Sequence, residues 1–309
     1  MPARASDPPS PRAGGPLRLA TRGSPLARWQ AEWVADALRP MTDVELVIVD
    51  TVGDRRQDVS LAVIGGQGVF VKEVQAAVLD GRADAAVHSA KDLPSVTAPG
   101  LEIGAIGARD DPRDALVGSS LAALPPNGRV ATGSIRRRAQ LAHLRPDLEF
   151  DDLRGNIGTR LAKASGYDAI VVAVAALRRL GLDDRVTEAL DPELMVPQVG
   201  QGAIAVECRD GDVSTRTLLG AIDDDASRRC VIAERAFLAV LGSGCTLPVG
   251  AHATVIGDRL SLHAVIVSVD GKTLLTHRAE SRDAVALGEA VGRHLLDSAG
   301  GRELLEGLR

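Results

Sequence analysis

The chain of 309 residues is too long for one ordinary hydrophobic core, and its length predicts two or three domains of about 100 residues each. Its composition, 45% hydrophobic and 25% charged, is typical of a soluble globular protein, and no run approaches the roughly 18 apolar residues of a membrane helix. The net charge of −5 argues against bulk attraction to nucleic acid or to an anionic membrane surface.

Cysteine usage and the first residues indicate the cellular compartment. The three cysteines, at positions 208, 230 and 245, form no CxxC pair and no cluster with histidine at metal-ligand spacing, so no metal site is expected. Residues 1–16 are rich in Pro, Gly, Ala and Ser and lack an apolar core, which predicts a disordered tail rather than a signal peptide. We therefore expect a cytoplasmic protein.

Short strand-like runs alternate with helical patterns over the first two thirds of the chain. This alternation predicts an α/β architecture with mostly parallel, buried strands. Ser24 before Pro25 is typical of a helix start, with serine as the cap, and further helices are expected after the glycines before Phe70 and from Ser134. The predicted strands cover residues 17–21, 44–52, 85–89, 101–108, 129–133, 169–175 and 203–208.

Two segments punctuated by Pro and Gly, at 110–115 and 195–202, flank a middle block. Since a strand follows the second segment, the chain is expected to return to its first sheet, giving two lobes joined by two crossings that can hinge. The expected limits are 17–110 with 203–222 for lobe 1, and 111–200 for lobe 2.

The pattern changes after residue 225, where a small antiparallel α+β domain is expected up to residue 309. A helix pattern covers 224–241, and three strand patterns follow it. The junctions IGDR and VDGK are typical of hairpin turns. A last helix is expected at 284–298.

Arginine is densest between residues 129 and 160. Arg136 and Arg137 fall in the first turn of the helix expected from Ser134, where the helix dipole disfavours a cation. Their presence there indicates a bound anion, a carboxylate or a phosphate held by forked guanidinium donors.

The segment LRGNIGTR carries a second pair, Arg154 and Arg160, separated by glycines that allow close approach of the backbone. One interpretation is a further anion-binding site. The other is a solvated charged loop whose arginines pair with Asp151 and Asp152. The residues by themselves favour neither.

Polar side chains also follow the first and third predicted strands. Arg22 and Ser24 come after one, and Lys91 and Asp92 after the other, where open α/β sheets present their ligand crevice. A carboxylate among several guanidiniums is expected to stay ionised at neutral pH, so Asp92 could stabilise a cation that develops on an anionic substrate.

Cys245 lies on a glycine loop, LGSGCTLPVG, whereas Cys208 and Cys230 lie in a strand pattern and a helix pattern and are interpreted as packing residues. No neighbouring histidine supplies a Cys/His couple, which argues against a protease-like thiol. A covalent attachment point remains.

Nine segments, in order, resemble the porphobilinogen deaminase family, also called hydroxymethylbilane synthases, over residues 17 to 250. The resemblance implies a three-domain α/β protein whose first two lobes are similar to type II periplasmic binding proteins. It implies a transferase that joins four porphobilinogen molecules head to tail, with loss of ammonia, into the linear tetrapyrrole hydroxymethylbilane. The segments are ATRGSPLARWQ, GGQGVFVKE, VHSAKDLP, DPRDA, ATGSIRRRAQL, LRGNIGTRL, AVAALRRLGL, VGQGAIAVECR and GSGCTLPVG.

The resemblance also implies a dipyrromethane cofactor, bound by a thioether to the cysteine that matches Cys245. The glycine loop would let such a linked group reach the cleft. Each pyrrole unit carries acetate and propionate groups, so the growing chain is a polyanion that suits many guanidiniums. A monomer is expected, with porphobilinogen as its small-molecule partner and with no nucleic acid or membrane.

Carried over residue by residue, the resemblance implies roles for single side chains. Asp92 matches the catalytic aspartate, which contacts pyrrole N–H groups and stabilises the cationic azafulvene formed when ammonia leaves. Cofactor contacts are implied for Cys245, Lys91, Thr132, Ser134, Arg136, Arg137 and Arg160, of which Arg160 also matches a substrate-side arginine. Substrate contacts are implied for Arg22, Ser24, Gln30, Phe70, Ser89, Arg154, Arg179 and Gln201.

This sequence departs from the family pattern at three positions. Val63 and Gln67 stand where many relatives have lysine, within a glycine-rich segment, 53–70, that is interpreted as a flap. Gly133 stands where a serine is common. These departures put in doubt a flap-lysine contact with substrate carboxylates and one hydroxyl contact with the cofactor.

An alternative from another class is a non-catalytic solute receptor with the same two lobes. It explains a hinge and anion-binding helix starts, but it gives no role to a third domain that offers Cys245. A nucleic-acid-binding regulator is disfavoured because no helix-turn-helix segment and no net basic charge are present.

Overall fold

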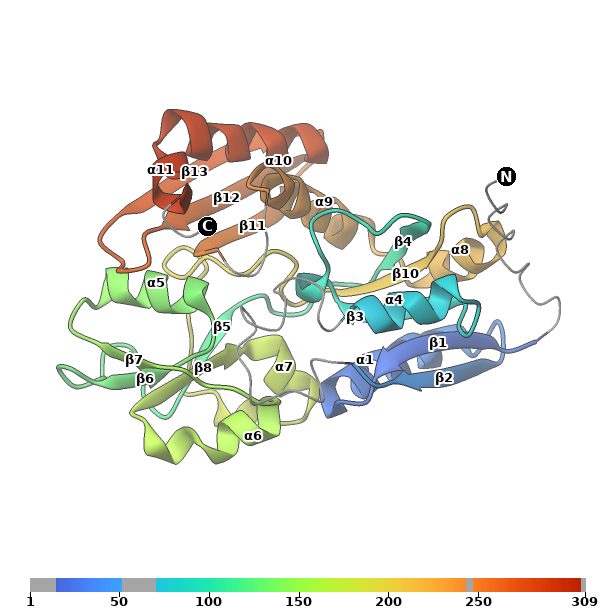
Figure 1. Ribbon diagram of the computed structural model, residues 1–309, viewed down its shortest axis with the longest axis horizontal. Helices are drawn as coiled ribbons and strands as arrows, with labels where there is room; N and C mark the ends of the chain where they lie inside the picture. The colour runs from blue at the N-terminus through green and yellow to red at the C-terminus, as the bar shows by residue number, and fades with distance from the viewer. Residues whose placement is uncertain (1–14, 52–70, 243–246, 307–309) are drawn as a thin grey trace, which may run out of the picture.

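The computed structural model describes residues 15–51, 71–242 and 247–306. Three sheets organise this part of the chain into two lobes and a C-terminal domain (Figure 1). Two sheets have five strands each and carry helices, and the third has three antiparallel strands covered by helices. The predicted α/β class, with two lobes and a small α+β C-terminal domain, is confirmed.

Lobe 1 contains the first five-stranded sheet. Its helix α1 begins as predicted, because the Ser24 hydroxyl accepts a hydrogen bond from the Ala27 backbone N–H at 3.3 Å and Pro25 follows the cap. The elements are β1 (Leu17–Arg22), α1 (Pro25–Leu38), β2 (Val44–Val49), α4 (Lys72–Leu79), β3 (Ala85–Ser89), the 3₁₀ turn η1 (Ala90–Asp92), β4 (Leu101–Ile106), β10 (Ile204–Arg209) and α8 (Val213–Leu219). The strand order is β2-β1-β3-β10-β4.

Lobe 2 contains the second five-stranded sheet. Its helix α5 is capped by Ser134, whose hydroxyl accepts from the Arg137 backbone N–H at 3.4 Å, as predicted. The elements are β5 (Asp114–Val117), β6 (Arg129–Ala131), α5 (Ile135–Leu144), β7 (Glu149–Asp151), α6 (Ile157–Ala162), β8 (Ala169–Ala173), α7 (Val174–Arg179) and β9 (Glu188–Ala189). The strand order, β7-β6-β8-β5-β9, repeats the pattern of lobe 1.

The strands that cross between the lobes run against their neighbours. β10 pairs antiparallel with β3 and β4, and β5 pairs antiparallel with β8 and β9. The remaining pairs in these two sheets, β1 with β2 and β3, and β6 with β7 and β8, are parallel. Four of the five strands in each sheet therefore run in the same direction, which confirms the prediction of mostly parallel strands. β5 and β10 are the exceptions, because each enters its sheet from the opposite lobe rather than through a crossover helix.

Several predicted strand limits also differ from the observed ones. The apolar run at 169–175 ends as a strand at Ala173, and helix α7 begins at Val174, since a short buried apolar run does not distinguish strand from helix. The strands predicted at 44–52 and 101–108 end at Val49 and Ile106. The short strands β5, β7 and β9 have no counterpart in the prediction.

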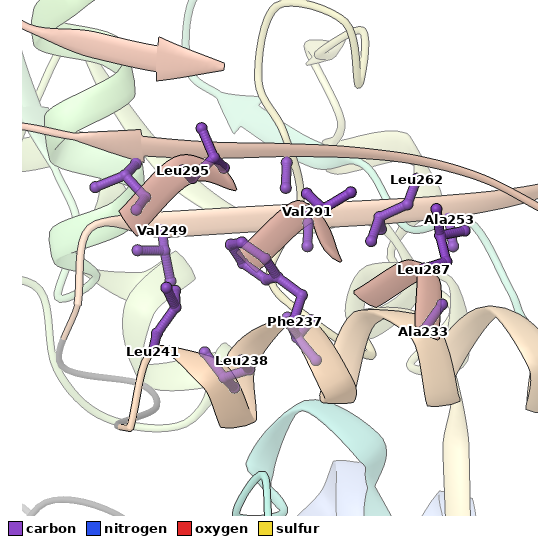
Figure 2. Close-up of a cluster of buried hydrophobic side chains, with 14 of the residues drawn as sticks. Ala233, Phe237, Leu238, Leu241, Val249, Ala253, Leu262, Leu287, Val291 and Leu295 are labelled. Carbon is purple, nitrogen blue, oxygen red and sulfur yellow. The ribbon is translucent and has the colours of Figure 1, made fainter. Parts of the chain in front are cut away.

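The C-terminal domain packs helices on one face of its sheet. Figure 2 shows Phe237 of helix α9 directed toward the strands, near Leu287 and Val291 of helix α10, in a cluster that is fully or nearly fully buried. Gly288 allows α10 to approach α9, because a Cβ there would meet the carbonyl oxygen of Ala233. The elements are α9 (Asp225–Val240), β11 (Val249–Ile256), β12 (Arg259–Val267), β13 (Leu274–Ser281), α10 (Ala284–Arg293), a π-helical turn (His294–Ser298) and α11 (Gly301–Glu306).

Both predicted hairpins are present in this domain. β11 and β12 pair antiparallel across Gly257 and Asp258, and β12 and β13 pair antiparallel across residues 268–273. Helix α9 lies between the C-terminal sheet and lobe 1, where it contacts β4 (Figure 1). Within the described ranges, no helix has the length and apolar character needed to span a membrane.

Candidate active site

Two cavities lie on either side of the turn that carries Lys91 and Asp92. The first, of about 410 Å³, is lined by residues of both lobes, of the second crossing and of the C-terminal domain. The second, of about 450 Å³, is lined by residues of lobe 1. Lys91 lines both cavities, so one short turn at the carboxyl end of β3 faces each of them.

The first cavity combines an apolar wall with a few polar groups. Lys91, Ser134 and Arg136 supply the charged and hydroxyl groups. The apolar wall comes from three parts of the fold and consists of Leu93, Val199, Leu238, Leu247 and Val249. Such a surface suits a ligand that combines an apolar body with acidic substituents.

The start of helix α5 is built around a buried ion pair. Asp114, the first residue of β5, is fully buried, and its two carboxylate oxygens lie 2.7 Å from Arg136 Nη1 and 2.8 Å from Arg137 Nη2. Burial alone would raise the pKa of Asp114, but the two guanidiniums outweigh it and hold the pKa well below its usual range. The anion that the sequence predicts at this helix start is therefore the carboxylate of Asp114, a group of the protein itself.

Arg136 nevertheless keeps donors for a ligand. Its Nη1 donates to the Val196 carbonyl oxygen at 2.8 Å, while its buried Nε and Nη2 have no hydrogen-bond partner among the described residues. Buried donors normally have partners. Since Arg136 lines the first cavity, these atoms fit a ligand that brings acceptor oxygens.

Lys91 is a cation in unfavourable surroundings. Burial lowers the pKa of its ammonium group, the nearby charges of Arg137 and Arg160 act in the same direction, and Asp92 and Asp114 oppose them. Together these effects bring the pKa to about 8. An anionic ligand would offset this cost.

The second cavity contains most of the substrate residues predicted in lobe 1. Arg22, Ser24, Gln30, Ser89 and Asp92 all line it. The Gln30 Nε2 donates to the Ser89 hydroxyl at 2.8 Å and so joins helix α1 to the end of β3. The fold thus brings together, around Asp92, side chains that are up to 70 residues apart in the chain.

His88, in β3, also lines this cavity. Its Nε2 lies 3.2 Å from the carboxylate of Glu207 on β10, and both side chains are buried.

Arg160 of the LRGNIGTR segment is half-buried in helix α6 of lobe 2. Arg160 donates from Nε to the Gly155 carbonyl oxygen at 2.9 Å. Burial lowers the pKa of its guanidinium, the charges of Arg137 and Arg154 act in the same direction, and Asp92 opposes them. Together these effects bring the pKa to about 10. Arg160 therefore interacts electrostatically with Asp92 of the turn.

Arg179 and Gln201 line neither cavity, and both hold the crossing segments. Arg179 Nη2 donates to the Gly202 carbonyl oxygen at 2.5 Å, and its guanidinium lies over the Trp29 ring, 5.7 Å from the ring centre. Gln201 is fully buried and donates from Nε2 to the Pro112 carbonyl oxygen at 2.7 Å and to Asp114 at 2.9 Å.

Two further predicted cofactor residues support α5 from outside the first cavity. Thr132 is buried, and its hydroxyl accepts from the Ser134 backbone N–H at 3.2 Å. Arg137 donates to the Val171 carbonyl oxygen at 3.0 Å in addition to its pairing with Asp114. At Gly133, a Cβ would lie 2.8 Å from the Leu153 carbonyl oxygen, so a serine there would displace backbone.

Cys245, Phe70, Gln67 and Val63 lie outside the described residues. The other two cysteines are buried, and burial raises the pKa of Cys208 to about 12 and that of Cys230 to about 11, so both are poor nucleophiles. No group of three or more His, Cys, Asp or Glu side chains suited to a metal ion occurs in the part of the chain that the structure describes.

Sequence reasoning missed two parts of this site. Asp114 stands in the DPRDA segment, which carried the resemblance but was given no role, and its burial between two arginines depends on the fold. The apolar wall residues Leu93, Val199 and Leu238 resemble any other core position in the sequence, since only their exposure to the cavity distinguishes them.

Two family models of porphobilinogen deaminase match most of the chain. A family model described as "Porphobilinogen deaminase, dipyromethane cofactor binding domain" matches residues 17–217, and one described as "Porphobilinogen deaminase, C-terminal domain" matches residues 228–297. A porphobilinogen deaminase of Syntrophotalea carbinolica is 47% identical over 290 residues, covering 91% of each chain. One of Roseiflexus castenholzii is 48% identical over 300 residues, covering 94% of this chain and 99% of that relative.

Two solved structures resemble the fold distantly. A putative methionine-binding lipoprotein of Bacillus subtilis matches with a TM-score of 0.41 and 12% identity, over 68% of this chain and 91% of that chain. A TRAP periplasmic solute binding protein of Ralstonia eutropha matches with a TM-score of 0.38 and 14% identity, over 72% of this chain and 81% of that chain. Likenesses of this size carry no argument, and the fold rests on the strand orders given above.

Proposed function

The chain belongs to the porphobilinogen deaminase family, and we propose that it condenses four porphobilinogen molecules head to tail, releasing ammonia, to give the linear tetrapyrrole hydroxymethylbilane. Membership makes it a transferase of tetrapyrrole biosynthesis that acts on porphobilinogen and uses a dipyrromethane cofactor. The observation that carries the residue assignment is the pair of cavities that meet at the Lys91–Asp92 turn.

The first cavity is the proposed cofactor site. When bound, the dipyrromethane supplies the pyrrole end to which substrate units are added. The buried free donors of Arg136 and the ammonium of Lys91 suit its acid groups, and the apolar wall that includes Leu238 and Val249 suits its rings. Ser134 lines the same cavity, while Thr132 and Arg137 hold the start of α5 in place.

We propose that Cys245 anchors the cofactor through a thioether. Leu247 lines the first cavity, and a separation of two residues spans at most about 7 Å of extended chain, which supports an anchor within reach of this cavity. The glycines of the loop supply the backbone freedom that a linked group requires.

The second cavity is the proposed substrate site. The carboxylate of Asp92 lies where it can stabilise positive charge that develops on porphobilinogen as ammonia departs, an electrostatic contribution typical of catalytic sites. Arg22 within the cavity, with Arg160 and Arg154 from lobe 2, is proposed to bind the acetate and propionate groups. Ser24, Gln30 and Ser89 supply hydrogen bonds, and Phe70 is proposed as a further contact.

Arg179 and Gln201 are assigned a supporting part in this site. Their contacts with the crossing segments support a role in holding the lobes for substrate binding rather than a direct contact.

We also infer the division of the chain into residues 17–110 with 203–222, 111–200 and 225–309, a division that the three sheets support. A monomer is inferred from the family resemblance, and a cytoplasmic location remains a prediction from the sequence.

Intact-mass spectrometry of the purified protein tests this proposal. The wild-type protein should be heavier than its sequence by two linked pyrrole units, and Cys245→Ser protein should have its sequence mass and no turnover of porphobilinogen. Cys208→Ala, which alters a buried thiol far from the loop in sequence, should keep the increment. An increment retained by Cys245→Ser would exclude Cys245 as the anchor. A wild-type protein that binds porphobilinogen without turnover would favour a receptor.

A further inference from the structure

The turn that carries Lys91 and Asp92 is supported by the second crossing segment, residues 198–203. The Ala90 backbone N–H donates to the Ala203 carbonyl oxygen at 3.0 Å. The Gln198 Nε2 donates to the Lys91 carbonyl oxygen at 3.2 Å. The turn therefore depends for its position on a segment more than 100 residues away in the chain.

Gly200 is the point of closest approach between this segment and the turn. A Cβ at Gly200 would lie 3.0 Å from the Ala90 carbonyl carbon and 3.1 Å from both the Ala90 Cβ and the Lys91 backbone nitrogen. The φ angle of Gly200 is also +72°, a conformation that L side chains rarely adopt. Both the backbone angle and the lack of space require glycine here.

Gly200 is itself held by the C-terminal domain. Its backbone N–H donates to the carboxylate of Glu234 on α9 at 2.7 Å. Glu234 is fully buried and also accepts from Arg109 Nη1 at 2.6 Å and from the Ala253 backbone N–H at 2.8 Å. Arg109 Nε in turn donates to the Gln201 carbonyl oxygen at 2.9 Å. One carboxylate thus ties both crossings to the C-terminal domain.

We propose that Gly200, fixed by Glu234, is a positioning residue that sets the placement of the Lys91–Asp92 turn. The C-terminal domain, which carries the proposed cofactor cysteine, then also determines where the catalytic carboxylate lies. A misplacement of about 1 Å at a reacting group can lower the rate about 100-fold. This inference rests on the proposed function, because it assigns Asp92 to the reaction.

Two glycine substitutions test the inference directly. Gly200→Ala combines a strained φ with contact against the turn. Gly211→Ala is the matched control, because Gly211 has a similar φ of +77° but no atom within 4 Å of an added Cβ. For Gly200→Ala we expect kcat to fall about 100-fold with the KM for porphobilinogen nearly unchanged and the mass increment retained. Gly211→Ala should keep the wild-type kcat.

Amide hydrogen exchange supplies a measurement that does not depend on activity. Exchange at Ala90, whose N–H donates to the Ala203 carbonyl oxygen, and at Leu93, whose N–H donates to the Ala90 carbonyl oxygen, should speed up at least about 10-fold in Gly200→Ala and stay unchanged in Gly211→Ala. Normal kcat in Gly200→Ala, unchanged exchange there, or an equal change in Gly211→Ala would overturn the inference. If the wild-type protein failed to turn over porphobilinogen, the proposed function would fail, while the exchange comparison would still decide whether Gly200 positions the turn.

Glu234→Gln tests the second half of the proposal. It keeps the shape of the side chain but removes the charge that faces Arg109. It should lower kcat and speed exchange at Ala90, as Gly200→Ala does. Glu289→Gln, in an exposed pair with Arg293 on α10, is the control that should change neither. A folded Glu234→Gln protein with wild-type kcat and exchange would show that Gly200 acts without the C-terminal domain.

Discussion

Arg137 and Asp114 form a buried ion pair at the base of lobe 2, with Arg137 Nη2 lying 2.8 Å from Asp114 Oδ1. Gln201, from the second crossing, donates to the same carboxylate oxygen at 2.9 Å. Asp114 is the first residue of β5, the strand that follows the first crossing. Its carboxylate therefore connects both crossings to helix α5, which starts at the first cavity. The guanidinium of Arg136, which lines the first cavity, is thus paired with a carboxylate that lies where the two crossings meet.

Replacing Asp114 by Asn should destabilise the protein. Removing one partner of a buried ion pair leaves the other charge uncompensated and typically costs about 3–5 kcal/mol. Urea unfolding at pH 7 should show a loss of this size. Asp184→Asn, at an exposed position, should show almost none. Equal stability of Asp114→Asn and wild type would contradict this account of the pair.

The effect of Asp114 should also depend on pH. Because its pKa is lowered in the folded protein, its contribution to stability is fully present above the unfolded pKa of about 3.9 and is lost as pH falls below that value, through the folded pKa. The stability difference between wild type and Asp114→Asn should therefore shrink below about pH 4. A difference that grew in acid would show that the pKa is raised instead.

Lys91 should lose its proton at lower pH than an ordinary lysine. Competitive acetylation of Cys245→Ser protein at a series of pH values, read by peptide mass spectrometry, should give a midpoint of about 8, against about 10.4 for a lysine in a model peptide. Lys272, which is highly exposed, supplies the comparison peptide. A bound polyanion should raise the midpoint of Lys91, so wild-type protein with its cofactor should label at higher pH. A midpoint near 10 without the cofactor would refute the burial argument.

The same shift predicts a pH effect on stability. The folded pKa of Lys91 lies below its unfolded value, so its contribution to stability is smallest at neutral pH and grows as pH rises from about 8 toward about 10.4. Lys91→Gln removes this dependence. The free energy of unfolding of the variant minus that of wild type without cofactor should therefore be larger at pH 7 than at pH 10. Unfolding curves at the two pH values check the sign.

Asp92→Asn should lower kcat by about 100-fold or more, because the amide keeps the shape of the side chain but removes the charge that stabilises a developing cation. The KM for porphobilinogen should change little, since the acid groups of the substrate are bound elsewhere. Steady-state assays on protein with a full mass increment measure both constants. Asp258→Asn, at an exposed turn of the C-terminal domain, is the control. Near-normal turnover of Asp92→Asn would move the catalytic role to another group.

Arg160→Gln should weaken substrate binding. Hydrogen bonds to charged groups are worth about 1.5–3 kcal/mol, which corresponds to an increase in KM of about 10- to 100-fold. Arg160→Lys should recover only part of this, because an ammonium group cannot bind a carboxylate in the two-point geometry of a guanidinium. Arg185→Gln, exposed in lobe 2, should behave as wild type. Unchanged KM in Arg160→Gln would exclude this arginine from carboxylate binding.

Features of the fold that depend on neighbouring residues were predictable from the sequence. The caps at Ser24 and Ser134 follow from hydroxyl groups that reach a backbone N–H three residues away, and the two hairpins of the C-terminal domain follow from their turn residues. The family and its chemistry followed from motifs in a fixed order. The placement of Lys91 and Asp92 after the third strand followed from the strand pattern itself.

Only the tertiary structure decided which of these residues meet. Arg137 and Asp114 are 23 positions apart in the chain. Their pairing shows that an arginine at a helix start can bind a carboxylate of the protein itself rather than a ligand. The direction of β10 and the contact of Gly200 with the Lys91 turn depend on a chain that returns from the other lobe. Capping and turn formation involve atoms a few residues apart and are encoded locally, whereas burial and charge pairing depend on segments brought together by the whole fold, which no local pattern specifies.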